Sequence, residues 1–314
     1  MRAGALLREQ RLSQPKPPSS CFNSMKRLSI LLLLACFLAQ CVPTGEKATQ
    51  PELTIFVGAA SKPPTEEIID QFQRETGIKV NAIFGGSGYV LSQMKLAQKG
   101  DVYFPGSSDY MDLAIAQDLV FPETEKRVVY LVNAINVQKG NPKNIQSLRD
   151  LCRPGIKLAI ANPEGVCVGA YAVELIEQNL SPEEQQQLRA NIVNYTESCD
   201  KTATAVALKG VDAVIGWRVF HYWNPEQIET IPLQQEEIVR IGYIPVAVAT
   251  FTQNRELAQQ FIDYTISEKG RQVFQKYHYF ASPQEAEAWI GAPKPVGGNY
   301  EVPPKWLPGA AAAQ

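Results

Sequence analysis

FGGSGYVLSQMKLAQKGDVYF, residues 84–104, combines a glycine-rich turn, an amphipathic segment and a short apolar run. The glycines around Ser87 allow positive φ and a close approach of the backbone to a bound molecule. Apolar Val90 and Met94 stand at helical spacing after Ser87, which can cap the helix. Gly100 is the expected C-terminal stop of this helix, and Val102–Phe104 predicts a short buried strand. The turn therefore offers N–H groups and a helix dipole to an anion. An ordinary strand-to-helix turn is the alternative that this stretch leaves open.

Strand and helix also alternate upstream of this stretch. Leu53–Val57 is an apolar run, and in the following segment Ser61 can cap a helix that has Pro63 in its first turn and Gly77 as its stop. Such alternation predicts the α/β class, with parallel strands covered by helices on both faces. Ligands bind in these folds outside the carboxyl ends of the strands, where the loops with Ser61 and Ser87 lie.

The second half of the chain repeats the same theme. Val128–Val137 predicts one long strand that ends at a Lys-Gly-Asn-Pro turn, where the chain crosses into a second lobe. IKLAIANPEGVCVGAYAVELIEQNL predicts a strand, a loop and a helix, and Ser181 opens the next helix with a capping box. Asp200 is expected to cap a further short helix. VRIGYIPVAVATF predicts a strand that returns to the first lobe.

Composition narrows the class of function. The chain has 314 residues, a formal charge of −2 and 45% hydrophobic residues, which is typical of one large or two medium globular domains. Without a basic excess, we do not expect nucleic-acid binding. Gly-Gly-Ser-Gly-Tyr misses the nucleophile-elbow motif by one position, and no histidine–carboxylate spacing predicts a metal site. We therefore expect no enzyme, with His221 and His278 packed among aromatic residues.

The N-terminal region predicts export. MKRLSILLLLACFLAQC, residues 25–41, has a basic start and an apolar core too short to span a bilayer. Residues 1–40 are thus expected to be a signal segment, with Met25 as a candidate for the true start. The Leu-Ala-Gln-Cys sequence that ends at Cys41 resembles the lipobox of bacterial lipoproteins, which predicts lipidation of Cys41; simple cleavage is the alternative. Residues 41–52 form a polar tether, and the Pro- and Gly-rich tail 291–314 is expected to be extended or disordered.

From Leu53 to about Ser282, the chain resembles the molybdate- and tungstate-binding periplasmic proteins. The resemblance is carried by TIFVGAAS, FGGSG, GDVYFPGSSDYMD, NPEGVCVGAYA and YIPVAVATF, in this order. It implies the two-lobe type II periplasmic binding protein fold, with mixed sheets flanked by helices and a two-strand hinge. Residues 53–131 and 246–290 would then form lobe 1, and residues 132–245 lobe 2.

The resemblance also implies a function. The chain would be a monomeric periplasmic receptor that passes one oxyanion, molybdate or tungstate, to an ABC permease with its ATPase, held at the membrane by a lipid anchor alone and without a cofactor. The implied donors are the Ser87 hydroxyl, the Ser61 hydroxyl or, as its alternative, the Ala60 amide, the Val168 amide, and the loop Cys199–Lys201. Helix N-termini offset a dianion without the desolvation cost of a buried cation.

One departure from the family pattern concerns a donor of the second lobe. Where the family supplies a tyrosine hydroxyl, this chain reads IGWRVF, with Val219 near the expected place. Arg218 is the candidate replacement because its guanidinium suits oxyanions, although a surface arginine is an equal alternative. We expect Trp217 to pack in the core.

The cysteines are the other departure. Cys167 and Cys199 both precede predicted helix starts at the same cleft. A periplasmic location predicts a disulfide between them, with unpaired buried thiols or ligation of a soft metal as alternatives. Cys152 is expected to be a small buried residue. Alternative functions are therefore a receptor for another anion or a soft metal complex that uses Cys167 and Cys199, or a sensory ligand-binding component.

Overall fold

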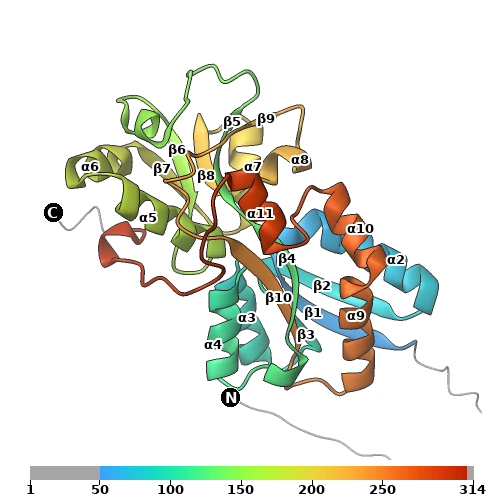
Figure 1. The fold of residues 1–314 in the computed structure, drawn as a ribbon. Helices are drawn as coiled ribbons and strands as arrows, with labels where there is room; N and C mark the ends of the chain where they lie inside the picture. The colour runs from blue at the N-terminus through green and yellow to red at the C-terminus, as the bar shows by residue number, and fades with distance from the viewer. Residues whose placement is uncertain (1–49, 310–314) are drawn as a thin grey trace, which may run out of the picture. The chain divides into compact units, whose positions relative to one another are not determined.

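The computed structural model describes residues 50–309 (Figure 1). The predicted signal segment, the start of the tether and Cys41 lie outside the described residues. Within residues 50–309, no helix is long and apolar enough to cross a membrane.

The first lobe is built on a five-stranded mixed sheet. Its strands lie in the order β2 (Lys79–Gly85), β1 (Glu52–Gly58), β3 (Val102–Phe104), β10 (Gly242–Val248) and β4 (Lys126–Leu131). β1 is parallel to β2 and β3, and β10 is antiparallel to β3 and β4. Helices flank this sheet on both sides: α2 (Lys62–Thr76), α3 (Ser87–Ala97), α4 (Ser108–Ala116), α9 (Arg255–Ile266) and α10 (Glu268–Lys276) (Figure 1).

The second lobe has its own five-stranded mixed sheet. Its strands lie in the order β7 (Ile192–Thr196), β6 (Leu158–Ala161), β8 (Ala213–Trp217), β5 (Asn133–Gln138) and β9 (Ile228–Ile231). β6 is parallel to β7 and β8, and β5 is antiparallel to β8 and β9. The accompanying helices are α5 (Cys167–Asn179), α6 (Pro182–Asn191), α7 (Cys199–Ala207), α8 (Phe220–Trp223) and α11 (Pro283–Ile290). Four 3₁₀ turns complete the described elements: η1 (Ala59–Ser61), η2 (Pro122–Thr124), η3 (Leu148–Cys152) and η4 (Pro304–Trp306).

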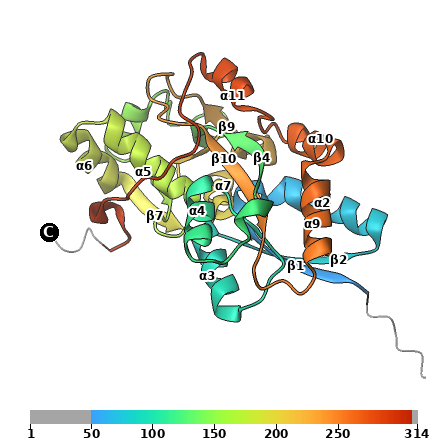
Figure 2. The ribbon, with the colours of Figure 1, turned by 60° about the horizontal axis from the view of Figure 1, so that its bottom comes forward.

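Two crossings connect the sheets, as the predicted hinge requires. The single strand expected at Val128–Val137 is in fact two strands, because the chain leaves the first sheet after β4 and enters the second at β5. Val132 lies at the break, and its carbonyl accepts a hydrogen bond from the Arg218 backbone N–H at 2.9 Å. The chain returns between β9 and β10, and Figure 2 shows β4 and β10 side by side between the lobes. The predicted domain boundaries stay a prediction.

The hydrophobic core does not divide cleanly between the lobes. One cluster contains Phe104 and Ala60 of the first lobe together with Cys167 and Cys199 of the second. The other cluster lies within the second lobe and takes in Trp306 of the C-terminal segment. Apolar contact therefore continues from one lobe to the other.

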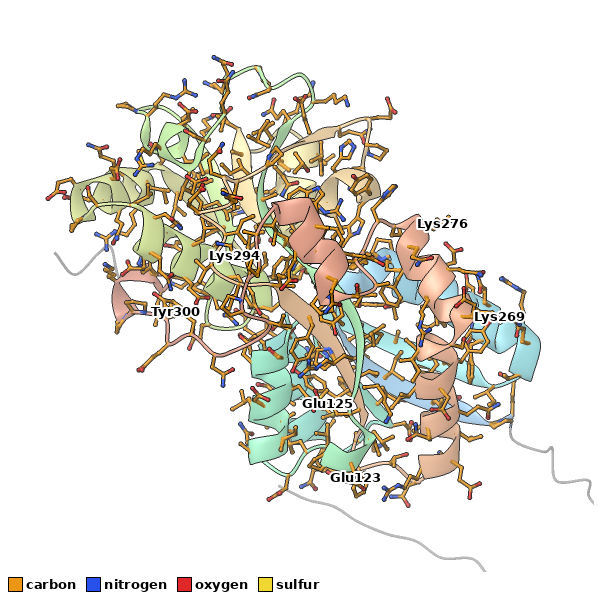
Figure 3. All side chains as sticks on the ribbon, in the orientation of Figure 1. Glu123, Glu125, Lys269, Lys276, Lys294 and Tyr300 are labelled. Carbon is orange, nitrogen blue, oxygen red and sulfur yellow. The ribbon has the colours of Figure 1, made fainter. Side chains whose placement is uncertain are left out.

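Several helix ends lie where the sequence predicts them. Gly77 ends α2 with φ of 71°, a left-handed conformation that glycine adopts without a steric penalty. Ser181 and Glu184 form the predicted capping box of α6. On the solvent side, Lys269 and Lys276 of α10 form ion pairs with α2, both at 2.7 Å (Figure 3). Exposed pairs of this kind contribute little to stability.

Three predicted helix ends are wrong. Gly86, not Ser87, is the N-cap of α3, and Ser87 is the first helical residue. The same helix ends at Ala97, before Gly100. Ser198, not Asp200, caps α7, because the helix begins at Cys199 and Asp200 is its second residue. The Asp200 carboxylate bonds to Lys62 of the first lobe.

The described part of the C-terminal segment is extended and packed. Apart from η4, residues 292–309 form no regular helix or strand. The fully buried Trp306 donates from its indole to Glu177 of α5 at 2.5 Å. Lys294 and Tyr300, labelled in Figure 3, mark the path of this segment over the second lobe. Of the two alternatives for the tail, the described part shows the extended one.

Candidate functional site

The starts of several helices face one another across the two sheets. In the first sheet, η1 follows β1, α3 follows β2, and the turn at Gly106 follows β3. In the second sheet, α5 follows β6 and α7 follows β7. This edge, outside the carboxyl ends of parallel strands, is where α/β folds bind ligands. Because α7 lies against η1, the two edges meet.

Gly106 marks the point where these segments come together. A β-carbon added to Gly106 would lie 2.6 Å from Ala60 Cβ, 2.7 Å from Cys167 Sγ and 3.4 Å from Ser87 Oγ. Residues of three different loops thus surround one backbone position. The site is called the donor cluster below and comprises Ala60, Ser61, Ser87, Gly106, Cys167, Val168 and Cys199.

Ser87 is buried and faces Gly106. Its hydroxyl oxygen accepts a hydrogen bond from the Gly106 N–H at 2.9 Å, and its carbonyl accepts one from the Tyr103 hydroxyl at 3.0 Å. Burial raises the pKa of Tyr103 well above its ordinary value, so this phenol stays protonated as a donor. Ser87 is held on both sides, which fixes the direction of its hydroxyl.

The loop with Ala60 and Ser61 is held by a residue that sequence reasoning missed. The Tyr279 hydroxyl donates to the Ala60 carbonyl at 2.6 Å, across 219 positions of the chain. Ser61 Oγ accepts from Thr65 Oγ1 at 3.1 Å, so its hydroxyl is engaged within the start of α2. The only sequence signal for Tyr279 was its place in an aromatic run near the C-terminal helices.

Val168 and Cys199 lie close together on the second-lobe side. Burial raises the pKa of the Cys199 thiol, the nearby Cys167 raises it further, and the Val168 backbone N–H opposes the shift. The Val168 amide, a predicted anion donor, therefore faces the Cys199 sulfur. The structure thus brings Ala60, Ser61, Ser87 and Val168 to one site.

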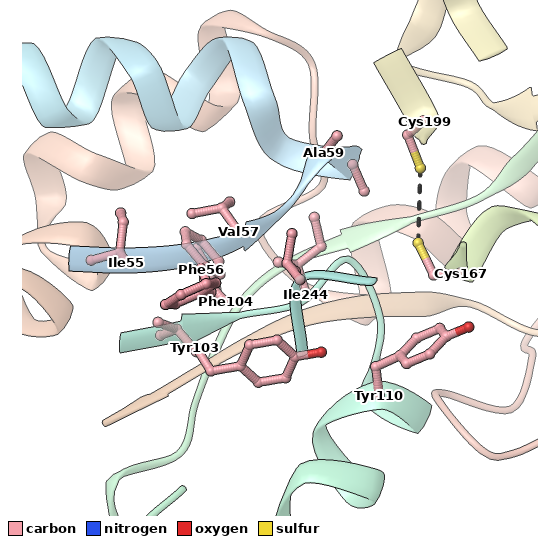
Figure 4. Packing of buried hydrophobic residues seen from close by; sticks show 14 of the residues in the cluster. Ile55, Phe56, Val57, Ala59, Tyr103, Phe104, Tyr110, Cys167, Cys199 and Ile244 are labelled. Carbon is pink, nitrogen blue, oxygen red and sulfur yellow. Dashed lines mark hydrogen bonds between the residues drawn. The ribbon is translucent and has the colours of Figure 1, made fainter. Parts of the chain in front are cut away.

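Cys167 and Cys199 are free thiols in this structure, as in the second of the three alternatives weighed from the sequence. Their sulfur atoms are 3.8 Å apart, and each residue is only 1% exposed (Figure 4). Cys152 lies elsewhere, buried as expected, with its thiol 3.4 Å from the Glu184 carbonyl. Burial raises the pKa of Cys152 to about 11. Within residues 50–309, no group of three or more His, Cys, Asp or Glu side chains could hold a metal ion.

The lobes touch across the site. The Gly88 N–H donates to the Gly165 carbonyl at 3.0 Å, and the Tyr110 hydroxyl donates to the Glu164 carbonyl at 3.1 Å. Lys62 of the first lobe pairs with Asp200 of the second at 3.1 Å. The structure is therefore a closed arrangement, with the donor cluster shut away from solvent.

Lys201 lies at the rim rather than within the cluster. Its side chain is exposed and pairs with Glu197, and its backbone N–H donates to Ser198 Oγ at 3.4 Å. Both lobes line a cavity of about 700 Å³ here, with Lys62, Gly86 and Tyr89 on one side and Glu197, Asp200 and Lys201 on the other. No residue of the donor cluster lines this cavity.

Arg218 is not brought to the donor cluster. Its guanidinium lies over the Phe280 ring at 4.2 Å and donates to the Tyr222 hydroxyl at 3.3 Å and to the His278 carbonyl. It lines a separate cavity of about 290 Å³, together with His221 and Trp289. Burial lowers the pKa of Arg218.

The neighbouring aromatic residues pack as expected. Trp217 is fully buried and meets Tyr171 edge to face at 5.0 Å. His278 stacks on Tyr222 at 3.8 Å, and His221 meets the same ring at 4.9 Å. These contacts assign both histidines to an aromatic packing cluster.

A family model described as bacterial extracellular solute-binding protein matches residues 53–280. The chain belongs to this family. It is 23% identical over 274 residues to the molybdate-binding protein ModA of Escherichia coli K12, covering 81% of this chain and 99% of the relative. The solved sulfate-binding protein SubI of Mycobacterium tuberculosis superposes with a TM-score of 0.67 at 14% identity, covering 79% of this chain and 94% of that one. The periplasmic molybdate-binding protein of Azotobacter vinelandii superposes with a TM-score of 0.64 at 15% identity, covering 73% and 99%.

These comparisons confirm the two-lobe type II fold and the resemblance to molybdate-binding periplasmic proteins. This chain is thus a solute-binding protein and not an enzyme. A further relative, the putative ABC transporter substrate-binding lipoprotein YvgL of Bacillus subtilis, is 22% identical over 254 residues, covering 81% of this chain and 95% of the relative.

Proposed function

We propose that this solute-binding protein captures a tetrahedral oxyanion, molybdate or tungstate first, at the donor cluster. The observation that carries the proposal is the meeting of Ala60, Ser87 and Cys167 around Gly106. The helices α2, α3, α5 and α7 all begin at or beside this point. Each helix start carries roughly half a positive charge from the aligned peptide dipoles, so several starts together offset a dianion.

The donors of this site are neutral. Ser87 supplies a hydroxyl, and Ala60 and Val168 supply amides. Ser61 accepts from Thr65, so its own hydroxyl proton remains free to donate to the anion. The Lys201 and Arg218 side chains stay outside, since one pairs with Glu197 and the other lies over Phe280. Neutral donors avoid burying a cation when the site is empty, and discrimination against smaller anions then depends on the size and chemistry of the site.

Closure would deliver the ligand to its partner. An open form binds the anion through one lobe, and the second lobe completes the donors when the hinge at Val132 closes. The closed form then docks on an ABC permease. In this proposal, the mature chain is a monomer in the periplasm, anchored through a lipid on Cys41. The similarity to ModA and to the sulfate-binding SubI supports an oxyanion as the ligand.

Ser87→Ala is expected to weaken molybdate binding by about 1–3 kcal/mol, because the bound anion loses a donor in a buried site. Calorimetric titration with molybdate, tungstate, sulfate and phosphate measures the loss. Ser92→Ala is the matched control, since Ser92 lies on the same helix with an exposed hydroxyl bonded to the Gly88 carbonyl. An unchanged titration of Ser87→Ala would remove Ser87 from the site.

A further inference from the structure

The sulfur atoms of Cys167 and Cys199 occupy the second-lobe side of the donor cluster. Both residues are the first of their helices, α5 and α7, and these helices follow the adjacent parallel strands β6 and β7. Strand pairing therefore fixes the spacing of the thiols. Cys167 Sγ lies so close beside Gly106 that a β-carbon there would be 2.7 Å from it, and Cys199 Sγ lies 3.8 Å from Cys167 Sγ. A small anion held by Ser87 and Gly106 would touch sulfur on its far side.

Sulfur is an unusual group to find at this place. A thiol is a weak hydrogen-bond donor and acceptor, so it adds little to the binding of an oxygen atom. Thiolates are instead soft ligands that form bonds to metal centres. The 3.8 Å separation of the two sulfur atoms suits such a role. Two metal–sulfur bonds of about 2.3 Å, the length of a zinc–thiolate bond, span about 3.8 Å when the angle between them is about 110°.

We propose that Cys167 and Cys199 bind the central metal of the captured oxyanion directly through sulfur and so select a metal oxyanion over sulfate or phosphate. This inference rests on the proposed function and concerns the selectivity of the same site among anions. Two thiols give up their protons and form two metal–sulfur bonds, while one oxo group takes both protons and leaves as water. The metal keeps its oxidation state, and the complex stays a dianion. No oxidant, reductant or further proton donor is needed.

The surroundings of the thiols fit this exchange. Both cysteines are only 1% exposed, so a metal centre bound to the two sulfur atoms would be shielded from water. Coordination then deprotonates the thiols at the moment when the metal supplies the compensating charge. The amides at the starts of α5 and α7 stabilise the negative complex. Sulfur and phosphorus in sulfate and phosphate do not exchange oxygen for thiolate under these conditions, and these anions would gain only hydrogen bonds.

The test uses the mature chain, kept reduced with a phosphine, and molybdate as the probe. Binding should produce a sulfur-to-molybdenum charge-transfer absorption band that saturates at one equivalent. Cys167→Ser and Cys199→Ser should each abolish the band and weaken molybdate binding about tenfold or more, with little effect on sulfate. Cys152→Ser, which removes the third buried thiol far from the site, should keep both the band and the affinity. Thermal unfolding of each variant shows whether it is folded.

The outcomes separate this inference from the proposed function. Saturable molybdate binding without the band, unchanged in both serine variants, would overturn the dithiol role and leave the oxyanion receptor standing. A failure of wild-type protein to bind molybdate and tungstate would overturn the oxyanion receptor itself. A disulfide between Cys167 and Cys199 in protein isolated without reductant, found by alkylation and mass spectrometry, would also overturn direct ligation. The absorption spectrum of the wild-type complex shows whether sulfur binds the metal, even where a variant fails to fold.

Discussion

Glu174→Ala is expected to lower the free energy of unfolding by about 3–5 kcal/mol, because it leaves a buried arginine without its carboxylate. Arg240 Nε lies 2.6 Å from Glu174 Oε2, and the two side chains are only 5% and 9% exposed. The same guanidinium lies over the Tyr171 ring at 3.7 Å and donates to the Gly298 carbonyl. The Arg240 guanidinium thus contacts both α5 and the C-terminal segment. Arg240 itself lies just before β10, the strand that returns to the first lobe.

Urea denaturation followed by circular dichroism measures this loss. Glu174→Gln keeps the volume and an acceptor oxygen and should lose less than the alanine variant. Glu75→Ala is the surface control, since it breaks the exposed pair with Lys269 and should leave the unfolding midpoint nearly unchanged. If Glu174→Ala unfolds at the wild-type urea concentration, the ion pair does not hold this junction.

Gly86→Ala is expected to keep the fold and oppose closure of the lobes. A β-carbon at Gly86 would lie 2.6 Å from the Gly165 carbonyl oxygen and 2.8 Å from the Glu197 carbonyl oxygen, both in the second lobe. Its own backbone, with φ −61° and ψ 140°, accepts any residue. Within the first lobe the added carbon meets only the Tyr89 ring, at 2.8 Å, and a side chain can shift, whereas the conflict with the backbone oxygens arises when the lobes meet. Two opposing backbone oxygens cannot rotate away as a side chain would. A cost of about 1–3 kcal/mol for the closed form corresponds to about a 5–150-fold loss of ligand affinity.

Small-angle scattering tests this prediction without reference to the ligand, since the variant should be more open than the wild type. Molybdate calorimetry then measures the loss of affinity. Gly85→Ala is the matched control one position earlier, where the added carbon meets only the Val90 side chain of the same lobe at 3.0 Å. Equal scattering curves for Gly86→Ala and wild type, with equal affinities, would show that closure does not bring Gly86 against the second lobe.

The order of strands and helices could be predicted from the sequence because its signals are local. Apolar runs, the glycine stop at Gly77 and the capping box at Ser181 each act within a few residues. The placement of Ser87 in a loop at the carboxyl end of a strand follows from the same alternation. These signals sufficed for the fold class and for placing Ser61 and Ser87 at the carboxyl ends of their strands.

The remaining details depend on contacts between distant parts of the chain. The break at Val132 leaves no mark in an apolar run that is buried on both sides. Asp200 lies within α7 rather than at its cap, and its carboxylate bonds to Lys62 of the other lobe. Arg218 follows directly after a buried strand. Its guanidinium nevertheless lies over the Phe280 ring and donates to the His278 carbonyl, and these contacts hold the side chain away from the donor cluster. The Tyr279 hydroxyl reaches Ala60 only once the C-terminal helices have packed.

The apolar cluster that runs from Phe104 and Ala60 to Cys167 and Cys199 gives closure a driving force of its own. Opening the hinge exposes part of this cluster to water, so the equilibrium of the ligand-free protein already favours the closed conformation. The charge of the bound anion therefore contributes little to moving the lobes together. Its hydrogen bonds contribute instead to the affinity with which each ligand is held.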